Sequence, residues 1–303
     1  MRPTAEGEGE TSDVDVELIL VPYDSGQRRA RMGAGPENLA QGDLPGELAR
    51  AGHPVVATTM IDLPAGSGSR GEIGSAFSLM AQLAQAVRSA RAMRRFPLVL
   101  AGNCNPAVGT VAGLDGGDGT AVVWFDAHGD FNTPETTVTG FLDGMALAML
   151  TGRCWSQLTR RVPGFTAVAE SAVRLVGARD LDHLEMEMLA GSAVGLISAA
   201  DIASDLPSAL ASIRPHATRA YLHVDLDVLD PSEGCANEFS VPGGLRLDDV
   251  IQAIGIVGAA LPIEAAALTA YDPAADPPGR IRKAAGHLAR AIVAASTSKG
   301  VAG

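Results

Sequence analysis

The stretch VWFDAHGDFNT, residues 123–133, decides how the rest of the chain is interpreted. It begins inside the apolar run TAVVWF at 120–125, which is typical of a buried β-strand. Asp126, His128 and Asp130 follow at alternate positions, so an extended backbone would direct their side chains to the same side. Carboxylates and an imidazole at the end of a strand suit a divalent cation such as Mn²⁺ or Zn²⁺. A solvated acidic turn is the alternative for this stretch alone.

A second stretch, YLHVDLDVLDP at 221–231, has the same arrangement. An apolar strand ends in Asp225 and Asp227, again at alternate positions, and Asp230 with Pro231 closes the turn. Buried carboxylates at strand ends are costly unless they are paired or bound to a metal. The two strand ends together supply four carboxylates and one histidine, which is enough for two adjacent metal ions.

The pattern Asp-Ala-His-x-Asp, followed later by Asp-x-Asp-x-x-Asp-Pro, resembles the arginase/agmatinase (ureohydrolase) family. The resemblance extends from about Leu18 to about Ala295. It implies a centre of two Mn²⁺ ions and a metal-bound hydroxide that hydrolyses a C–N bond, usually in a guanidino group. It also implies a small-molecule substrate and a possible homo-oligomer, either a trimer or a hexamer.

Length and composition agree with an enzyme of this kind. The chain has 303 residues and is 47% apolar, which suits a single arginase-like α/β hydrolase domain over 14–303 after a disordered acidic tail at 1–13. A formal charge of −12 argues against nucleic acid or an anionic membrane as a partner. No apolar run is long enough to span a membrane, the first residues lack the apolar core of a signal peptide, and the three cysteines form no obvious disulfide framework. We therefore expect a cytoplasmic protein.

Predicted strands alternate with predicted helices along the whole chain. The strands cover 14–21, 55–61, 96–101, 120–125, 172–176, 194–197, 220–224 and 263–271. The helices begin near Pro36 and then cover 75–94, 109–113, 145–149, 206–213, 247–261 and 281–295. This alternation predicts a three-layer α/β/α fold with a central, mostly parallel sheet, whose site lies at the carboxyl ends of the strands.

The resemblance assigns six metal ligands: Cys104, Asp126, His128, Asp130, Asp225 and Asp227. Cys104, in AGNCN at 101–105, takes the place of the histidine in the family's Gly-Gly-Asp-His-Ser segment. It would share one ion with Asp126 and Asp130 and with Asp227 or its neighbour, whereas His128 would bind the other ion. The two aspartates of the second motif would bridge in part, and Asp130 would also accept a hydrogen bond from the hydroxide.

The thiol changes what this centre is expected to bind. A thiolate is a softer ligand than an imidazole and favours Zn²⁺ or iron over Mn²⁺. A cysteine here is similar to that of the hydroxyarginine hydrolases of antibiotic pathways, an arginase branch that releases hydroxyurea. The alternative is a small buried cysteine and a lost or weak first metal position.

On the substrate side the resemblance assigns Asn132, Thr137 and Thr139 to an α-carboxylate, and Asp182 and Glu185 to an α-ammonium group. The alternative for the acidic pair is a solvated turn that begins a helix. Three further histidines are expected to be packing or surface residues rather than ligands: His183, His216 and His223.

Two catalytic positions depart from the family pattern. Asp143, in LDG at 142–144, stands where the family has a proton-shuttling histidine, and it could act as a shuttle only with a raised pKa. Ala270 stands where the family has the glutamate that binds the guanidinium group. A modified guanidine, an amidine, a formimino group or an amide is therefore more plausible as substrate than plain arginine or agmatine. A non-catalytic ureohydrolase-like binding protein and a metal-dependent deacylase are the alternatives.

Overall fold

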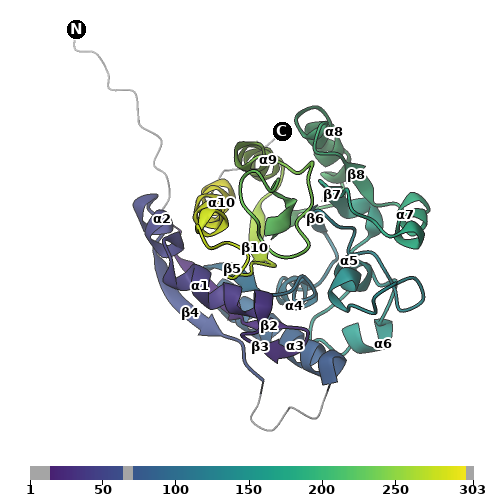
Figure 1. The fold of residues 1–303 in the computed structure, drawn as a ribbon, viewed down its shortest axis with the longest axis horizontal. Helices are drawn as coiled ribbons and strands as arrows, with labels where there is room; N and C mark the ends of the chain where they lie inside the picture. Colours follow the sequence, from purple (N-terminus) through teal and green to yellow (C-terminus); the bar gives the residue numbers. More distant parts are fainter. Residues whose placement is uncertain (1–13, 64–70, 298–303) are drawn as a thin grey trace.

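The fold is built on an eight-stranded sheet in which all neighbouring strands are parallel (Figure 1). The computed structural model describes residues 14–63 and 71–297, so the predicted acidic tail at 1–13 lies outside the described residues. In spatial order the strands are β4 (Val55–Met60), β1 (Val16–Val21), β5 (Phe96–Ala101), β10 (Ile263–Thr269), β9 (Arg219–Asp225), β6 (Thr120–Phe125), β7 (Val173–Val176) and β8 (Gly195–Ile197). A separate antiparallel ribbon contains β2 (Tyr23–Asp24) and β3 (Gln27–Arg28).

The central strands are covered on both faces. Every residue of β1, β5 and β6 is buried, as expected for apolar strands in a parallel sheet that lies between two layers of helices. Successive side chains point to opposite faces, so Leu18 belongs to one hydrophobic core and Ile19 to the other. The sheet therefore separates two cores.

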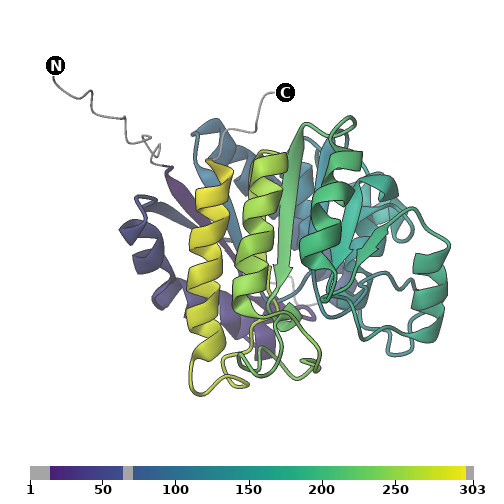
Figure 2. The ribbon, with the colours of Figure 1, turned by 90° about the horizontal axis from the view of Figure 1, so that it is seen from above.

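The helices form the two outer layers. One layer contains α1 (Gly35–Gln41), α2 (Leu44–Arg50), α8 (Ile202–Ile213), α9 (Leu247–Ala260) and α10 (Arg280–Ser296). The other contains α3 (Gly71–Ala92), α4 (Ala107–Gly113), α5 (Ala146–Leu150) and α7 (His183–Ala190), with the short α6 (Ser156–Thr159) nearby. Figure 2 shows α8, α9 and α10 side by side across one face of the sheet. The predicted three-layer α/β/α fold is confirmed.

Some predicted boundaries are wrong, for local reasons. The last strand does not reach Tyr271, because Ala270 adopts a φ of +60°, in the left-handed region, and an extended strand cannot continue through it. Helix α8 begins at Ile202 rather than Leu206, with Pro207 inside the helix. Two short helices, α2 and α6, were not predicted, although α2 begins with proline at an early helical position. Helix α7 was predicted only as the alternative for the acidic pair at its start, where it has a capping box.

Sheet order brings the two metal motifs together. Strands β6 and β9 are neighbours, and Phe125 pairs with Val224, so the residues that follow each strand lie at the same edge. On the other side of β9, Thr269 of β10 pairs with both Asp225 of β9 and Ala101 of β5. The loop after β5, which carries Cys104, therefore reaches the same edge, with β10 between it and β9.

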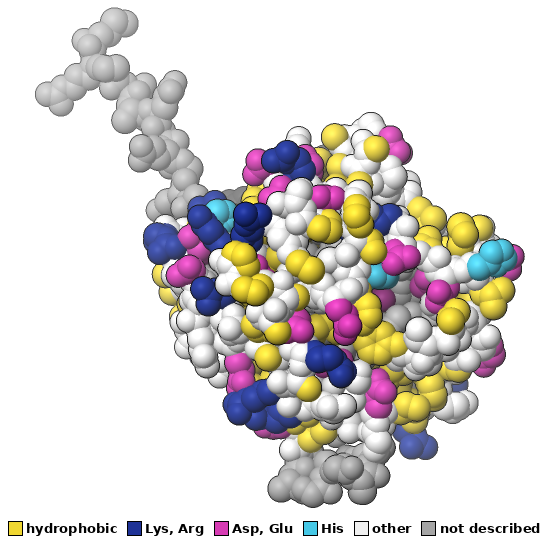
Figure 3. All heavy atoms as spheres, in the orientation of Figure 1, with side chains coloured by type: hydrophobic (Ala, Val, Ile, Leu, Met, Phe, Trp, Pro, Cys, Tyr) yellow, Lys and Arg dark blue, Asp and Glu magenta, His cyan; other side chains and the backbone are white. Residues whose placement is uncertain are grey.

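The surface in Figure 3 carries acidic and basic side chains interspersed with apolar ones, so no single sign of charge covers this face. Among the described residues, no helix is both long enough and apolar enough to cross a membrane.

Candidate metal centre

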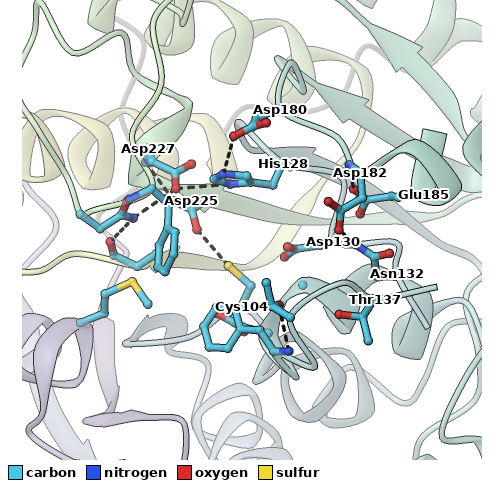
Figure 4. A pocket seen from close by; sticks show the side chains of 18 residues that line it. Cys104, His128, Asp130, Asn132, Thr137, Asp180, Asp182, Glu185, Asp225 and Asp227 are labelled. Atoms are coloured by element: carbon cyan, nitrogen blue, oxygen red, sulfur yellow. Dashed lines mark hydrogen bonds and ion pairs between the residues drawn. The ribbon is translucent and has the colours of Figure 1, made fainter. Parts of the chain in front are cut away.

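A pocket opens at the carboxyl ends of β5, β6, β9 and β10 and collects most of the predicted site (Figure 4). Five of the six predicted ligands line it: Cys104, His128, Asp130, Asp225 and Asp227. Asp143 lines it as well, and so do the predicted substrate-binding residues, which are Asn132, Thr137, Thr139, Asp182 and Glu185. The sixth ligand, Asp126, is buried beneath the pocket with 1% of its surface exposed.

The first motif bends after its strand instead of remaining extended. Asp126 accepts a hydrogen bond from the backbone N–H of His128 at 2.8 Å, and Asp130 has a φ of +50°. The expected simple alternation of side chains is therefore wrong for this segment. Even so, His128 Nδ1 lies 3.3 Å from Asp126 Oδ1 and 3.5 Å from Asp227 Oδ2, so the two motifs meet.

The carboxylates are buried close together. Burial raises the pKa of Asp130 and of Asp225 well above the usual range, and neighbouring carboxylates add to the effect. Burial lowers the pKa of His128, but the hydrogen bond to Asp126 and the charge of Asp227 outweigh it and raise that pKa to about 9. A divalent cation would remove the repulsion that keeps these acids from ionising together.

Asp130 carries the clearest sign of a missing partner. Its Oδ2 atom is buried and has no hydrogen-bond partner within the described part of the chain. The main-chain carbonyl of Asp130, by contrast, accepts hydrogen bonds from Leu147 N at 2.9 Å and Ala148 N at 3.1 Å. The loop thus holds Asp130 in a left-handed backbone conformation in the pocket wall. Its unpartnered carboxylate oxygen is available to bind a metal ion.

Cys104 lies within this acidic group. Its side chain is 2% exposed, its thiol donates to Asp225 Oδ2 at 3.0 Å, and Thr269 Oγ1 lies 3.2 Å from the sulfur. Burial raises the pKa of the thiol well above its usual value, and the charge of Asp225 adds to this. Cys104 would therefore need a bound metal to become a thiolate.

Two sets of possible metal ligands share Asp126. Asp126, His128 and Asp227 form one set, and Asp126, Cys104 and His223 form the other; within each, the ligand atoms lie within 4.8 Å of one another. His223 is also a packing residue, because its ring stacks on Trp124 with 3.5 Å between centroids. Burial lowers the pKa of His223 to about 3, so its imidazole is neutral. His183 and His216, which were also expected to lie outside the site, are exposed.

Among the predicted substrate-binding residues, Thr137 and Thr139 accept hydrogen bonds from Gly140 N and Phe141 N of their own loop, whereas the other three are fixed by longer-range contacts. Asn132 Nδ2 donates to Asp182 Oδ2 at 3.0 Å. Asp182 and Glu185 form a capping box at the start of α7, and Glu185 also accepts from Phe131 N at 2.8 Å. Asp182 and Glu185 therefore start a helix, which was the alternative to substrate binding, and they also line the pocket. In Figure 4 these side chains lie on the opposite side of Asp130 from Asp225 and Asp227.

Asp143 and Ala270, the two positions that differ from the family pattern, both line the pocket. Burial raises the pKa of Asp143 to about 7, against hydrogen bonds from Asn105 N, Cys104 N and Asn103 that lower it. Ala270 is 3% exposed and offers the pocket no side-chain oxygen.

Sequence reasoning missed several residues around the ligands. Asn237 is 1% exposed, and its Nδ2 donates to Asp227 Oδ2 at 3.1 Å and to Ala270 O at 2.8 Å. Trp124 Nε1 donates to Asp126 Oδ2 at 3.0 Å. The indole precedes Asp126 by two positions, so the strand pattern could have indicated it, whereas Asn237 sits in an irregular loop with no such signal.

Comparison with known proteins agrees with this geometry. A model of the arginase family matches residues 14–295. The chain belongs to the arginase family. It is 28% identical to the arginase of Bacillus caldovelox over 277 residues, covering 86% of this chain and 92% of that protein. It is also 28% identical to the arginase of Bacillus subtilis strain 168 over 299 residues, covering 93% and 98% respectively.

Solved structures give the same result. The crystal structure of arginase from Bacillus cereus has a TM-score of 0.81 at 25% identity and covers 95% of this chain and 99% of that one. The agmatine ureohydrolase of Thermoplasma volcanium, at 17% identity and a TM-score of 0.66, covers 95% of this chain and 92% of its own, and shares the fold. As an arginase-family ureohydrolase, the protein is a hydrolase of C–N bonds other than peptide bonds.

Proposed function

We propose that this arginase-family protein hydrolyses a C–N bond in a guanidino- or amidino-bearing, amino-acid-like small molecule, and that it requires divalent metal ions. The observation that carries the proposal is the buried group of acids at the strand ends, in which Asp130 Oδ2 faces the pocket without a partner. Burying these carboxylates together without a cation is energetically unfavourable. A metal ion is the simplest partner that satisfies them all.

The side chains present fit a two-metal centre. Asp126, His128 and Asp227 would hold one ion. Cys104, with Asp225 at hydrogen-bond distance and Asp130 beside them in the pocket, would contribute to the other. Oxygen and imidazole ligands suit Mn²⁺, and the thiol makes Zn²⁺ or another softer ion a candidate. When bound, such ions lower the pKa of a water molecule so that hydroxide becomes available near neutral pH.

The chain's own residues would orient the substrate. Asp182, with Asn132 beside it, would receive the ammonium and carboxylate end of an amino-acid-like substrate on one side of the pocket. Asp130 would accept a hydrogen bond from the attacking water through Oδ2. Ala270 offers no carboxylate to a free guanidinium group, so a substituted guanidine or an amidine is favoured over plain arginine.

The proposal is tested with purified protein that has been stripped of metal and then loaded with Mn²⁺ or Zn²⁺. A panel of arginine, N-hydroxyarginine, agmatine, a formimino amino acid and acylated amines is screened for the released product. We expect turnover of one guanidine or amidine that depends on metal and is lost in Asp126→Asn. Asp205→Asn, on the exposed surface of α8, is the control. Turnover by the stripped protein would refute the metal-dependent mechanism, and hydrolysis of acylated amines alone would indicate a deacylase.

A binding protein without turnover is the second candidate. Ala270, and Asp143 with its three hydrogen bonds to the Cys104 loop, favour it, because both depart from the residues that the family uses in catalysis. Calorimetric binding of a panel compound that persists after chelation, without turnover under any metal, would support this candidate. Trimeric or hexameric assembly and a cytoplasmic location remain predictions from the sequence.

A further inference from the structure

Asp143 is engaged by three donors from a single loop. Its Oδ1 accepts hydrogen bonds from Cys104 N at 2.7 Å and Asn105 N at 2.9 Å, and its Oδ2 accepts from Asn103 Nδ2 at 2.9 Å. The side chain is only 5% exposed, so these contacts take place away from bulk water. Both carboxylate oxygens are therefore occupied by the segment that presents the cysteine.

The partners of Asp143 are themselves fixed. Asn103 Oδ1 accepts from Ser25 N at 3.0 Å, and its Nδ2 also approaches buried Asp24 at 3.4 Å. Asp24 in turn forms an ion pair with Arg31, with 2.8 Å between Nε and Oδ2. The contact between Asp143 and Asn103 is thus one link in a chain of polar groups that begins at the surface.

On its other side, Asp143 is tied to the first metal motif. Gly144 O accepts from Asn132 N at 3.1 Å, which closes the loop that starts after Asp130. Asp143 therefore joins two loops: one carries Cys104, and the other carries Asp130 with Asn132, Thr137 and Thr139.

We propose that Asp143 is a positioning residue that fixes the Cys104 loop so that the sulfur faces the metal ligands, and that it is not a proton shuttle. The inference rests on the proposed metal centre. All three donors to Asp143 belong to the loop that carries Cys104, as a loop clamp requires, and none of them is a substrate-side group as a shuttle would need. A loop clamp needs only an acceptor in the right place, and an amide oxygen meets that need.

Two substitutions separate the roles. Asp143→Asn keeps the shape and the oxygen that accepts from the Cys104 and Asn105 amides, loses only the acceptor for Asn103 Nδ2, and cannot shuttle a proton. Asp143→Leu keeps the bulk and removes both acceptors. Each variant is loaded with Co²⁺ without substrate, and the near-ultraviolet charge-transfer band from thiolate to Co²⁺ is recorded. Cys104→Ser defines the spectrum without the thiolate, and Asp205→Asn is the exposed control.

We expect Asp143→Asn to retain the thiolate band and turnover within about tenfold of wild type, well short of the ~10²–10⁴-fold loss that follows removal of a proton-transfer group. Asp143→Leu should lose the band and bind Co²⁺ more weakly. If Asp143→Leu does not fold, Asp143→Ser, whose hydroxyl is too short to reach the two amides, should show the same loss.

The opposite pattern overturns the inference. If both substitutions retain the band while turnover falls by the full ~10²–10⁴-fold, Asp143 transfers protons and does not position the loop. A wild-type protein without a thiolate band also overturns it, because Cys104 would then not ligate. If the wild-type band is present but no panel compound turns over, only the proposed function fails.

Discussion

Replacing Asn237 with alanine should destabilise the metal-free protein and weaken its metal binding. The amide joins the second metal motif to the end of β10, through hydrogen bonds to Asp227 and to the carbonyl of Ala270. A hydrogen bond to a charged group contributes about 1.5–3 kcal/mol, and one between neutral groups contributes about 0.5–1.5 kcal/mol. Because both acceptors are buried and would lose a partner, we expect the free energy of unfolding to fall by about 2–4 kcal/mol.

Urea unfolding, followed by tryptophan fluorescence, measures this loss. Glu238→Ala is the matched control, because it changes the adjacent but exposed residue and should stay within about 0.5 kcal/mol of wild type. Metal titration should show a dissociation constant about 10–100-fold higher for Asn237→Ala, as is typical when a residue that orients a ligand is removed. If Asn237→Ala matches Glu238→Ala in both assays, the amide does not support Asp227 and the reasoning fails.

Three further predictions concern packing, the sulfur environment and the metal. Gly35→Ala would place a Cβ 2.1 Å from Tyr271 O and should lower the free energy of unfolding by about 1–3 kcal/mol in a thermal or urea melt. Gly255→Ala, with open space at its Cβ, should instead stabilise α9 by about 0.5–1 kcal/mol, and equal effects of the two variants would refute this. Thr269→Val removes the hydroxyl 3.2 Å from the sulfur of Cys104, and should weaken Co²⁺ binding in a competition assay; unchanged affinity would show that the hydroxyl is unimportant. Metal at 100 times its dissociation constant should stabilise the stripped protein by about 2.7 kcal/mol, seen as a higher melting temperature in calorimetry, and no shift would argue against a centre formed only in the folded state.

Much of the fold follows from local sequence pattern. The apolar runs of β5 and β6 have the bounds predicted for them, and Gly102 and Asp126 follow them directly. The helix start at Asp182 was one of the two interpretations of the acidic pair, and the spacing to Glu185 is that of a capping box. Here the local signal fits the helix start, while the pocket position of the same residues keeps the substrate-binding interpretation open.

The rest of the site depends on contacts that no local pattern carries. Asn237 meets Ala270 across 33 positions of sequence, and Asn103 meets Asp143 across 40. The first pairing follows from strand order, since β9 and β10 are neighbours, whereas the second joins loops after β5 and β6, which have β10 and β9 between them. Resemblance to a family could place Cys104 in the ligand set, but only the folded chain brings its sulfur to Asp225.

Strand order also explains why the departures from the family pattern occur together. The matching ligands follow β6 and β9, which are neighbours, whereas Cys104 follows β5 and Ala270 follows β10 on the other half of the site. Asp143, the third residue that differs from the family pattern, contacts the β5 side as well, because it binds the Cys104 loop through three hydrogen bonds. Cys104 is linked to Asp143 through its backbone N–H, and Ala270 follows Thr269, whose hydroxyl lies 3.2 Å from the sulfur. A change at Cys104 is therefore felt on the β5–β10 side, and we expect that side to influence which C–N bond is hydrolysed, while the residues after β6 and β9 retain the family's motifs.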